Sequence, residues 1–307
     1  MLPDISIVIT SYNSKEFLIK CIESIVKSIR KHSYEIIVVD DRSSDGSAQT
    51  VRERFPNTMI IQNKLNLGYV KSNNIGMRAA KGDKVLSLNN DTVILADAID
   101  KLADFMDKKP DAGAVGPKLL NADGSIQLQC RRRFPTPLNS LFYFTGLSRL
   151  FPKNRMFGAY LMTYIDDKET IKVDALCGAA MMVRREVIDQ VGLMDVSYIM
   201  YGDDIDWCYR MKQALKRNSS GQAGWKVYYL PEAEMIHYGG RGGSRKQSYR
   251  NIFEFHRAMA VFYSKHYSKR YFFLINWLVY SGIWLKCGFS LLQNLFRREK
   301  YVGTKKP

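Results

Sequence analysis

Apolar runs and helical spacings alternate along the N-terminal part of the chain. Residues 5–10 form a β-branched run typical of a strand, and apolar positions from Phe17 to Ile29 recur at helical spacing, which predicts a helix that Ser14 caps. The same pattern predicts strands at 35–40, 58–62, 84–88 and 112–115, with helices at 47–55, 69–80 and 96–108. Strands that alternate with helices indicate βαβ units, so we expect an α/β fold with a mostly parallel sheet flanked by helices.

The alternation breaks at residues 121–172, which are rich in Arg, Phe, Tyr and Pro and show no clear period. We interpret this segment as a functional insertion. Its run Arg131–Arg132–Arg133 either contacts a phosphate or is a solvated group of charges. From residue 173 the pattern predicts strands at 179–183 and 225–230 and helices at 184–191 and 203–216. Residues 1–244 therefore form one predicted domain.

The last apolar stretch, residues 271–296, is long enough to span a membrane, but Lys286 interrupts it. Polar or small residues gather on one helical face, and the rest is aromatic and aliphatic, which favours a helix lying in the membrane interface. The alternative is a buried helix that packs on the main domain. The length of this stretch alone leaves open whether the helix spans the membrane or lies on it. We thus expect residues 245–307 to be a helical, membrane-associated tail.

Charge strengthens this expectation for the tail. The net charge is +16, and residues 241–307 hold 14 Lys and Arg against two acids. Such a tail suits an anionic membrane or nucleic acid. Five scattered cysteines without a CxxC pair argue against a disulfide framework or a zinc site and suit a reducing cytosol. The first residues lack the pattern of a signal peptide.

Polar residues follow the predicted strands and outline a nucleotide site at the carboxyl edge of the sheet. An aromatic ring beside small polar residues can stack on a base, a carboxylate can accept a base N–H or a ribose hydroxyl, and glycine permits close backbone approach. The candidates are Thr10, Tyr12, Asp40, Asp41, Asn66, Gly68 and Asn74. The sequence has no GxGxxG after the first strand and no P-loop, which argues against a dinucleotide cofactor and a P-loop enzyme.

The strand predicted at 84–88 is followed by Asn89, Asn90 and Asp91, which suggest a metal-binding site. Asp91 could hold a divalent cation that in turn holds a diphosphate, although the three residues could equally form only a turn. His237 precedes a glycine-rich basic segment, 239–244, and is a second candidate ligand. Asp203 and Asp204 begin a predicted helix, where they either complement the helix dipole or supply a general base.

Five ordered segments resemble glycosyltransferase family 2, most closely its bacterial rhamnosyltransferase-like branch, over residues 3–244. They are SIVITSYNS, VVDDRSSDGS, NLGYVKSNNIG, LSLNNDT and CGAAMMVRREVIDQVGLMD…YGDDIDWCYR. The resemblance implies a GT-A (Rossmann-like) fold, an inverting mechanism, a nucleotide-diphosphate sugar donor and a divalent metal. Residues 121–172 then become an acceptor-side region.

The resemblance also implies residue roles. Thr10, Tyr12 and Asp41 match nucleoside contacts, with Asp40 adjacent, and Asn74 matches the pattern after the third strand. Asp91 matches the metal ligand of the DxD motif, and Asp204 matches the catalytic base. Asn89 replaces the first acid of DxD, and Asp203 replaces the usual Glu.

We therefore expect an inverting, family 2-like hexosyltransferase that uses Mg²⁺ or Mn²⁺ and a dTDP- or UDP-sugar. It would move rhamnose or a hexose to a saccharide hydroxyl, plausibly lipid-linked, in cell-surface polysaccharide synthesis. We expect the protein at the cytoplasmic face of the cell membrane. Its expected partner there is an anionic lipid surface and not nucleic acid. Assembly into a homo-oligomer is left open. The alternatives are a membrane-associated nucleotidyltransferase and a non-enzymatic basic module that binds membrane or nucleic acid.

Overall fold

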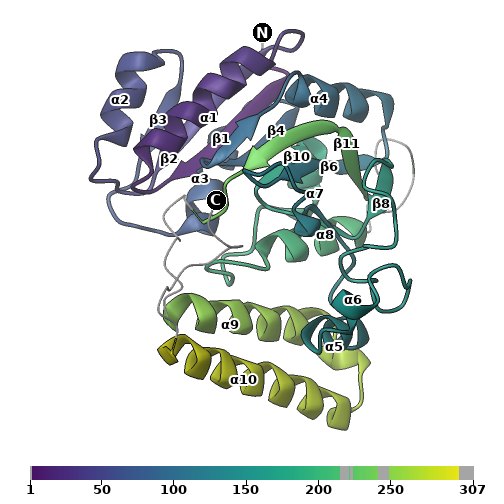
Figure 1. Cartoon of the computed structure of the whole chain (residues 1–307). Helices are drawn as coiled ribbons and strands as arrows, with labels where there is room; N and C mark the ends of the chain where they lie inside the picture. Colours follow the sequence, from purple (N-terminus) through teal and green to yellow (C-terminus); the bar gives the residue numbers. More distant parts are fainter. Residues whose placement is uncertain (1, 215–220, 222–223, 241–248, 297–307) are drawn as a thin grey trace.

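A computed structural model describes residues 2–214, 221, 224–240 and 249–296 of the chain (Figure 1). Within these residues the core is a nine-stranded sheet with the order β3-β2-β1-β4-β10-β6-β11-β5, and β8 pairs with β11. The strands are β1 (Ile5–Ser11), β2 (Tyr34–Asp40), β3 (Met59–Gln62), β4 (Lys84–Asn89), β5 (Thr92–Ile94), β6 (Ala112–Leu120), β8 (Ile171–Val173), β10 (Ala180–Arg184) and β11 (Lys226–His237).

The sheet is parallel in one half and mixed in the other. Strands β1 to β4 pair in parallel, as the sequence predicts. Strand β10 runs antiparallel to β4 and to β6, and β11 is parallel to β6 but antiparallel to β5 and β8. The expectation of a mostly parallel sheet is therefore wrong for the second half. The chain reaches β10 through the long segment after β6, so no βαβ crossover imposes a parallel direction on it.

Helices cover both faces of the sheet, and the hydrophobic core lies between the helices and the sheet. The helices of this part are α1 (Lys15–Ser28), α2 (Ser47–Arg54), α3 (Tyr69–Ala79), α4 (Ala98–Lys108) and α7 (Arg185–Val191). Figure 1 shows α1 and α4 on the near face of the sheet. Helix α3 comes unusually close to β1, because a Cβ atom at Gly76 would lie 2.3 Å from Cγ1 of Val8. Glycine at this position lets the helix and the strand touch.

Helix α1 begins differently from the prediction. Ser14 is its N-cap residue, but the Ser14 side chain makes no capping hydrogen bond. Instead, the Asp45 carboxylate accepts the N–H of Lys15 at 2.8 Å, so a residue from the loop after β2 satisfies this amide. The start of α1 is thereby tied to the carboxyl edge of the sheet.

Residues 121–172 contain short elements that the sequence pattern did not predict. They are the 3₁₀ helix η1 (Leu128–Cys130), the strand β7 (Arg131–Arg132), and the helices α5 (Pro137–Phe144) and α6 (Leu147–Leu150). Strand β7 pairs antiparallel with β9 (Ala175–Leu176), which anchors this segment beside the main sheet. Helix α8 (Asp203–Lys212) follows and ends earlier than the helix predicted at 203–216, with Gln213 as its C-cap residue. Residues 215 and 216 lie outside the described residues.

The C-terminal part is a helical hairpin below the sheet domain in Figure 1. Helix α9 (Tyr249–His266) packs on α8, where Phe262 and His266 contact the Tyr209 ring. The turn η2 (Ser268–Arg270) leads into α10 (Phe273–Phe296), which buries Ile283 and Cys287 along α9. The helix predicted at 271–296 is confirmed. None of the helices in the described ranges is long and apolar enough to cross a membrane.

Candidate active site

Four strands end at one edge of the sheet and bring the predicted site residues together. Thr10 of β1 pairs with Asn89 of β4, and Ser11 pairs with Asp40 of β2. Strand β11 runs in the same direction, so His237 at its end reaches this edge as well. Neighbouring strands lie about 4.8 Å apart, so the strand ends line a site a few strands wide.

Three buried polar atoms at this edge have no hydrogen-bond partner within the described residues. They are Oγ1 of Thr10, Oδ1 of Asp40 and Oδ1 of Asn89. A buried polar atom without a partner costs free energy, on the order of 1–3 kcal/mol, unless a ligand or water satisfies it. Because the three atoms lie at the ends of adjacent strands, they mark the place where a polar ligand would be held.

The two neighbouring aspartates have different surroundings. Both oxygens of Asp41 are occupied, because they accept the N–H groups of Leu67 and Gly68 at 2.8 and 2.9 Å and the side-chain amide of Asn63. Asp41 therefore shapes the loop before α3. Asp40 receives only long bonds at its Oδ2, 3.3 Å from the Ser43 amide and 3.4 Å from the Gln62 amide. Of the two aspartates, Asp40 is therefore the one with a carboxylate oxygen, Oδ1, that could accept a hydrogen bond from a ligand.

Tyr12 lies in the loop after β1 with its ring 39% exposed, as a stacking platform requires. The Asn13 carboxamide accepts the N–H of Ser44 at 2.8 Å and joins this loop to the one after β2. Asn66 is exposed near the same edge. Gly68 has φ +82°, a conformation that favours glycine, and is the N-cap residue of α3.

Asn74 serves the fold instead of facing a ligand. Its amide is buried and bonds both backbone groups of Met194, with Nδ2 donating to the carbonyl and Oδ1 accepting the N–H. For Asn74 we correct the predicted ligand contact, because burial and these two bonds leave it no path to a ligand. The Asn90 amide is also buried and donates to Oγ of Ser11, and its ligand contact stays a prediction.

Asp91 and His237 face each other across the end of the sheet. Nε2 of His237 lies 3.3 Å from Oδ1 of Asp91 and 3.3 Å from Nδ2 of Asn89. Nδ1 of His237 lies 2.9 Å from Oε1 of Gln127, whose Nε2 donates to the backbone carbonyl of His237 and to the side-chain Oδ1 of Asn121. That amide is fixed by its two acceptors, so Nδ1 carries the hydrogen that Oε1 accepts, and Nε2 is the ring nitrogen that faces Asp91.

This arrangement fits a divalent cation only as a partial set of ligands. Among the described residues no group of three or more His, Cys, Asp or Glu side chains is placed to hold a metal. Asp91, His237 and the unpaired Oδ1 of Asn89 supply a carboxylate, an imidazole and an amide oxygen. A histidine whose second ring nitrogen is held by a hydrogen bond is typical of metal ligation. Diphosphate oxygens of a bound donor would complete the coordination.

The predicted base, Asp204, lies at the N-terminus of α8 beside the end of β4. Its Oδ2 accepts the N–H of Gly178 at 2.9 Å and the guanidinium of Arg132 at 2.6 Å. Ala179, the next residue, accepts the backbone N–H of Asn89. Two residues of the β9–β10 turn therefore connect the base to the strand end that carries Asn89.

Asp203 is buried next to Asp204. Burial, together with the negative charge of Asp204, raises the pKa of the Asp203 carboxyl to about 7. Two adjacent carboxylates with different surroundings are characteristic of an acid–base site.

Arginines 131 and 132 correct another expectation. Both side chains are buried, so neither interpretation of the run, a phosphate contact or a solvated group of charges, holds for them. Arg131 donates to the carbonyls of Ile165 and Asp166 at 2.7 Å and stacks on Tyr229. Arg132 bonds Asp204. The sequence pattern singled out Arg132 without its partner Asp204 and missed Gln127 altogether, because both residues come from the segment without a period.

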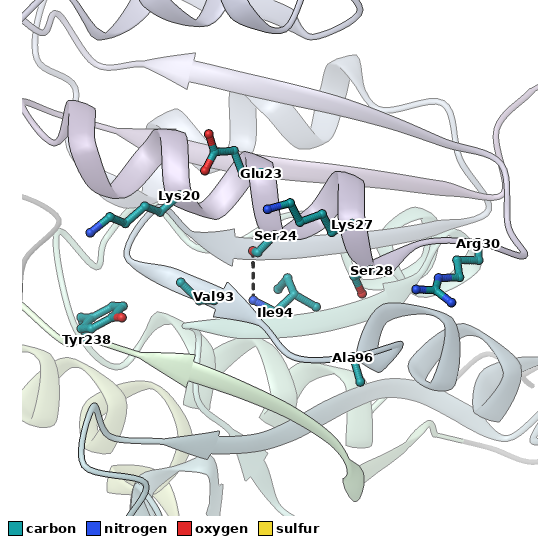
Figure 2. A pocket seen from close by; sticks show the side chains of 10 residues that line it. All are labelled: Lys20, Glu23, Ser24, Lys27, Ser28, Arg30, Val93, Ile94, Ala96 and Tyr238. Carbon is teal, nitrogen blue, oxygen red and sulfur yellow. Dashed lines mark hydrogen bonds between the residues drawn. The ribbon is translucent and has the colours of Figure 1, made fainter.

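A hollow of about 570 Å³ lies elsewhere, between α1 and β5 (Figure 2). Its walls carry Lys20, Lys27 and Arg30 from the helix side, with Val93 and Ile94 below. Tyr238 at one end follows His237, but the hollow contains none of the predicted catalytic or nucleotide-binding residues. It is therefore a surface groove behind the metal candidates rather than the reaction site. The basic segment 241–244 lies outside the described residues.

Comparisons with known proteins agree with the fold. The model of the family "Glycosyl transferase family 2" matches residues 6–192. A curated relative, N-acetylglucosaminyl-diphospho-decaprenol L-rhamnosyltransferase of Mycobacterium tuberculosis, is 26% identical over 276 residues, which cover 86% of each chain. Low-salt glycan biosynthesis hexosyltransferase Agl10 of Haloferax volcanii is 29% identical over 217 residues, 69% of this chain and 63% of that protein.

Solved structures share the fold. GalNAc-T7, determined with UDP, GalNAc and Mn²⁺, superimposes with a TM-score of 0.58 at 18% identity over 84% of this chain. The mannosyltransferase PcManGT of Pyrobaculum calidifontis, with GDP-Man and Mn²⁺, gives 0.55 at 15% identity over 86% of this chain. The chain spans 48% of the first structure and 64% of the second. At these identities the likeness concerns the fold alone.

Proposed function

Because the chain belongs to glycosyltransferase family 2 and is rhamnosyltransferase-like, we propose that it is an inverting, metal-dependent enzyme that moves rhamnose or a hexose from a nucleotide-diphosphate sugar to a lipid-linked saccharide. The observation that carries the proposal is the row of unpaired polar atoms at the ends of β1, β2 and β4, beside Asp91 and His237. Neither a nucleotidyltransferase nor a non-enzymatic module has an observation of its own in its favour.

The nucleoside of the donor, dTDP or UDP, binds at the ends of β1 and β2. Oγ1 of Thr10 and Oδ1 of Asp40 receive its polar groups, and the exposed Tyr12 ring stacks on its base. Asp41 holds the loop that contains Gly68 and exposes Asn66. This assignment places the base next to β2 and the diphosphate next to β4.

Asp91 and His237, with Oδ1 of Asn89, hold Mn²⁺ or Mg²⁺ against the donor diphosphate. The bound metal supplies charge stabilisation for the leaving nucleotide diphosphate. Gln127 fixes the His237 ring so that Nε2 faces Asp91.

Asp204 takes the proton of the acceptor hydroxyl as that oxygen attacks the anomeric carbon. The new bond forms from the acceptor oxygen to the carbon, the bond from that carbon to the diphosphate oxygen breaks, and the diphosphate leaves with the electron pair. One displacement of this kind inverts the anomeric configuration. A positioned general base contributes about 10²- to 10⁴-fold to the rate.

The acceptor is an N-acetylglucosaminyl-diphospho-lipid or a similar lipid-linked saccharide, as in the name of the mycobacterial relative. Helix α10 supports this choice. It exposes a stripe of large apolar side chains along one side: Leu278, Leu285, Phe289, Leu292 and Phe296. Helix α5 lies beside it, with Nζ of Lys286 at 6.0 Å from the Phe144 ring. The exposed bases Lys269 and Arg270 stand at the start of α10.

We therefore place α10 in the interface of the cytoplasmic leaflet as a peripheral anchor. Its apolar stripe enters the boundary between headgroups and acyl chains, and the bases meet anionic headgroups. The flanking bases Arg297, Arg298 and Lys300 fall outside the described residues. The site then works where a lipid-linked acceptor is presented.

Asp204→Asn tests the proposal. Wild-type protein is incubated with Mn²⁺, a panel of dTDP-rhamnose and UDP-sugars, and a synthetic N-acetylglucosaminyl-diphospho-lipid, and the release of nucleotide diphosphate is followed. We expect transfer from one donor, a product of inverted configuration, and at least a 100-fold lower kcat in the variant with donor binding retained. Normal turnover by Asp204→Asn would remove Asp204 from the role, and no transfer with any donor would refute the proposed function.

A further inference from the structure

Arg132 and Asp204 form a buried ion pair that connects the segment 121–172 to the proposed base. The guanidinium of Arg132 lies 2.6 Å from Oδ2 of Asp204, and the two side chains are 10% and 13% exposed. The pairing of β7 with β9 fixes the Arg132 backbone, and the same guanidinium donates to the Leu176 carbonyl. The ion pair is therefore held by backbone structure on the arginine side.

The hydrogen bonds distinguish the two oxygens of Asp204. Oδ2 accepts two donors, Arg132 and the N–H of Gly178, which fills both of its lone pairs. Within the described residues Oδ1 accepts only the N–H of Ile205, at 2.8 Å. One lone pair of Oδ1 therefore remains to receive a proton from an acceptor hydroxyl.

The neighbouring Asp203 makes the arginine necessary. Two adjacent acids in a buried place do not both ionise readily, because each negative charge disfavours the other. Among the described residues Arg132 forms an ion pair with Asp204 and none with Asp203, so its positive charge stabilises a carboxylate at Asp204. The other titratable groups that face this pair come from α3, the segment 121–172, the β9–β10 turn and α8, and are Tyr69, Tyr160, Cys177, Asp206 and Cys208.

We propose that Arg132 is a positioning residue for the transfer reaction: it keeps Asp204 as the ionised member of the acid pair and turns Oδ1 towards the acceptor. The role rests on the proposed function. In the reaction the acceptor O–H bond breaks, its proton passes to Oδ1 of Asp204, and Arg132 stays charged throughout. Asp203 takes no part in the proton transfer.

The segment 121–172 offers a matched control in Arg131. Arg131 belongs to the same strand and is equally buried, but its guanidinium bonds backbone carbonyls instead of a carboxylate. Arg131→Gln and Arg132→Gln therefore remove similar buried charges, and only the second removes the partner of Asp204. A purely structural role predicts similar effects of the two substitutions on the chemistry.

The experiment measures kcat/KM for transfer against pH in full-length wild type, Arg131→Gln, Arg132→Gln and Arg132→Lys. We expect Arg132→Gln to move the acidic limb of the profile up by at least one pH unit and to lower kcat at least tenfold. Arg132→Lys should return the limb to its wild-type position, since it restores the charge, and Arg131→Gln should leave the limb unmoved. The donor KM should stay within about threefold of wild type in the Arg132 variants.

An unmoved limb in Arg132→Gln, or the same shift in Arg131→Gln, overturns the proposal. UDP and Mn²⁺ in a thermal-shift assay show whether Arg132→Gln is folded. If it is not, Arg132→Lys decides, because its ammonium cannot keep the guanidinium geometry: a lowered kcat with an unchanged donor KM supports the role, and a wild-type kcat refutes it. Wild-type protein that transfers no sugar refutes the proposed function and this role together.

Discussion

Replacing Asp203 by Asn removes a buried group that changes its charge near neutral pH. Asp203 is 4% exposed, and burial, together with the charge of Asp204, raises the pKa of its carboxyl from 3.8 to about 7. In the unfolded chain the pKa returns to its ordinary value. The folded state therefore binds more protons than the unfolded state between these two values, and stability falls as pH rises through that window.

The magnitude follows from the window. Stability due to Asp203 is complete below pH 3.8 and decreases by about 1.4 kcal/mol per pH unit until the folded-state pKa is reached. Between pH 5 and pH 8 only the interval up to about 7 contributes. From pH 5 to pH 8 the unfolding free energy of the wild type should thus fall by roughly 2–3 kcal/mol more than that of Asp203→Asn.

Urea denaturation of both proteins at pH 5 and pH 8 measures this difference. The quantity of interest is the unfolding free energy of the variant minus that of wild type, because other titrating groups cancel in it. Asp195→Asn is the control: although burial acts upward, hydrogen bonds from Lys265 and Ser197 lower the pKa of Asp195 to about 2. Both its folded and unfolded values lie below 5, so its difference should be the same at the two pH values.

An equal difference for Asp203→Asn at pH 5 and pH 8 would refute the reasoning. It would mean that the Asp203 carboxyl titrates as in the unfolded chain and that burial and Asp204 do not perturb it. The assignment of separate roles to the two acids would then lose its physical basis.

Three further predictions concern the metal site and the membrane. Asp91→Ala should abolish the Mn²⁺-dependent part of UDP binding in calorimetry, and metal-dependent activity that survives this change would contradict the metal assignment. Gln127→Ala should weaken Mn²⁺ binding about 10- to 100-fold, because the His237 ring loses the bond at Nδ1; an unchanged affinity would exclude this ring from the site. Leu285→Glu with Phe289→Glu should abolish sedimentation with anionic vesicles, since each apolar side chain contributes about 1.5–3 kcal/mol when buried. Val26→Glu, which changes an exposed residue of α1, is the control and should sediment with the vesicles like wild type. Vesicle binding by the α10 variant would refute the role of α10 as an anchor.

The sequence by itself determined the strands and helices of the first half, the carboxyl-edge position of Thr10, Asp40 and Asn89, and the family. These features depend on local patterns: β-branched runs, helical spacing and polar residues at strand ends. The C-terminal helix was also visible, because its apolar stretch is long. Local periodicity needs no knowledge of distant contacts, so one sequence suffices for it.

Only the tertiary structure decided the direction of β10, the different tasks of Asp40 and Asp41, and the internal role of Asn74. Each depends on partners far away in the sequence, which no local pattern encodes. The same holds for Gln127 at His237 and Arg132 at Asp204, bonds that span 110 and 72 residues. Their segment lacks a clear period because its helices and its strand are short, and long-range bonds place these two side chains. The candidate residues of the site were readable from its motifs, but the residues that contact them became visible only when the chain was folded.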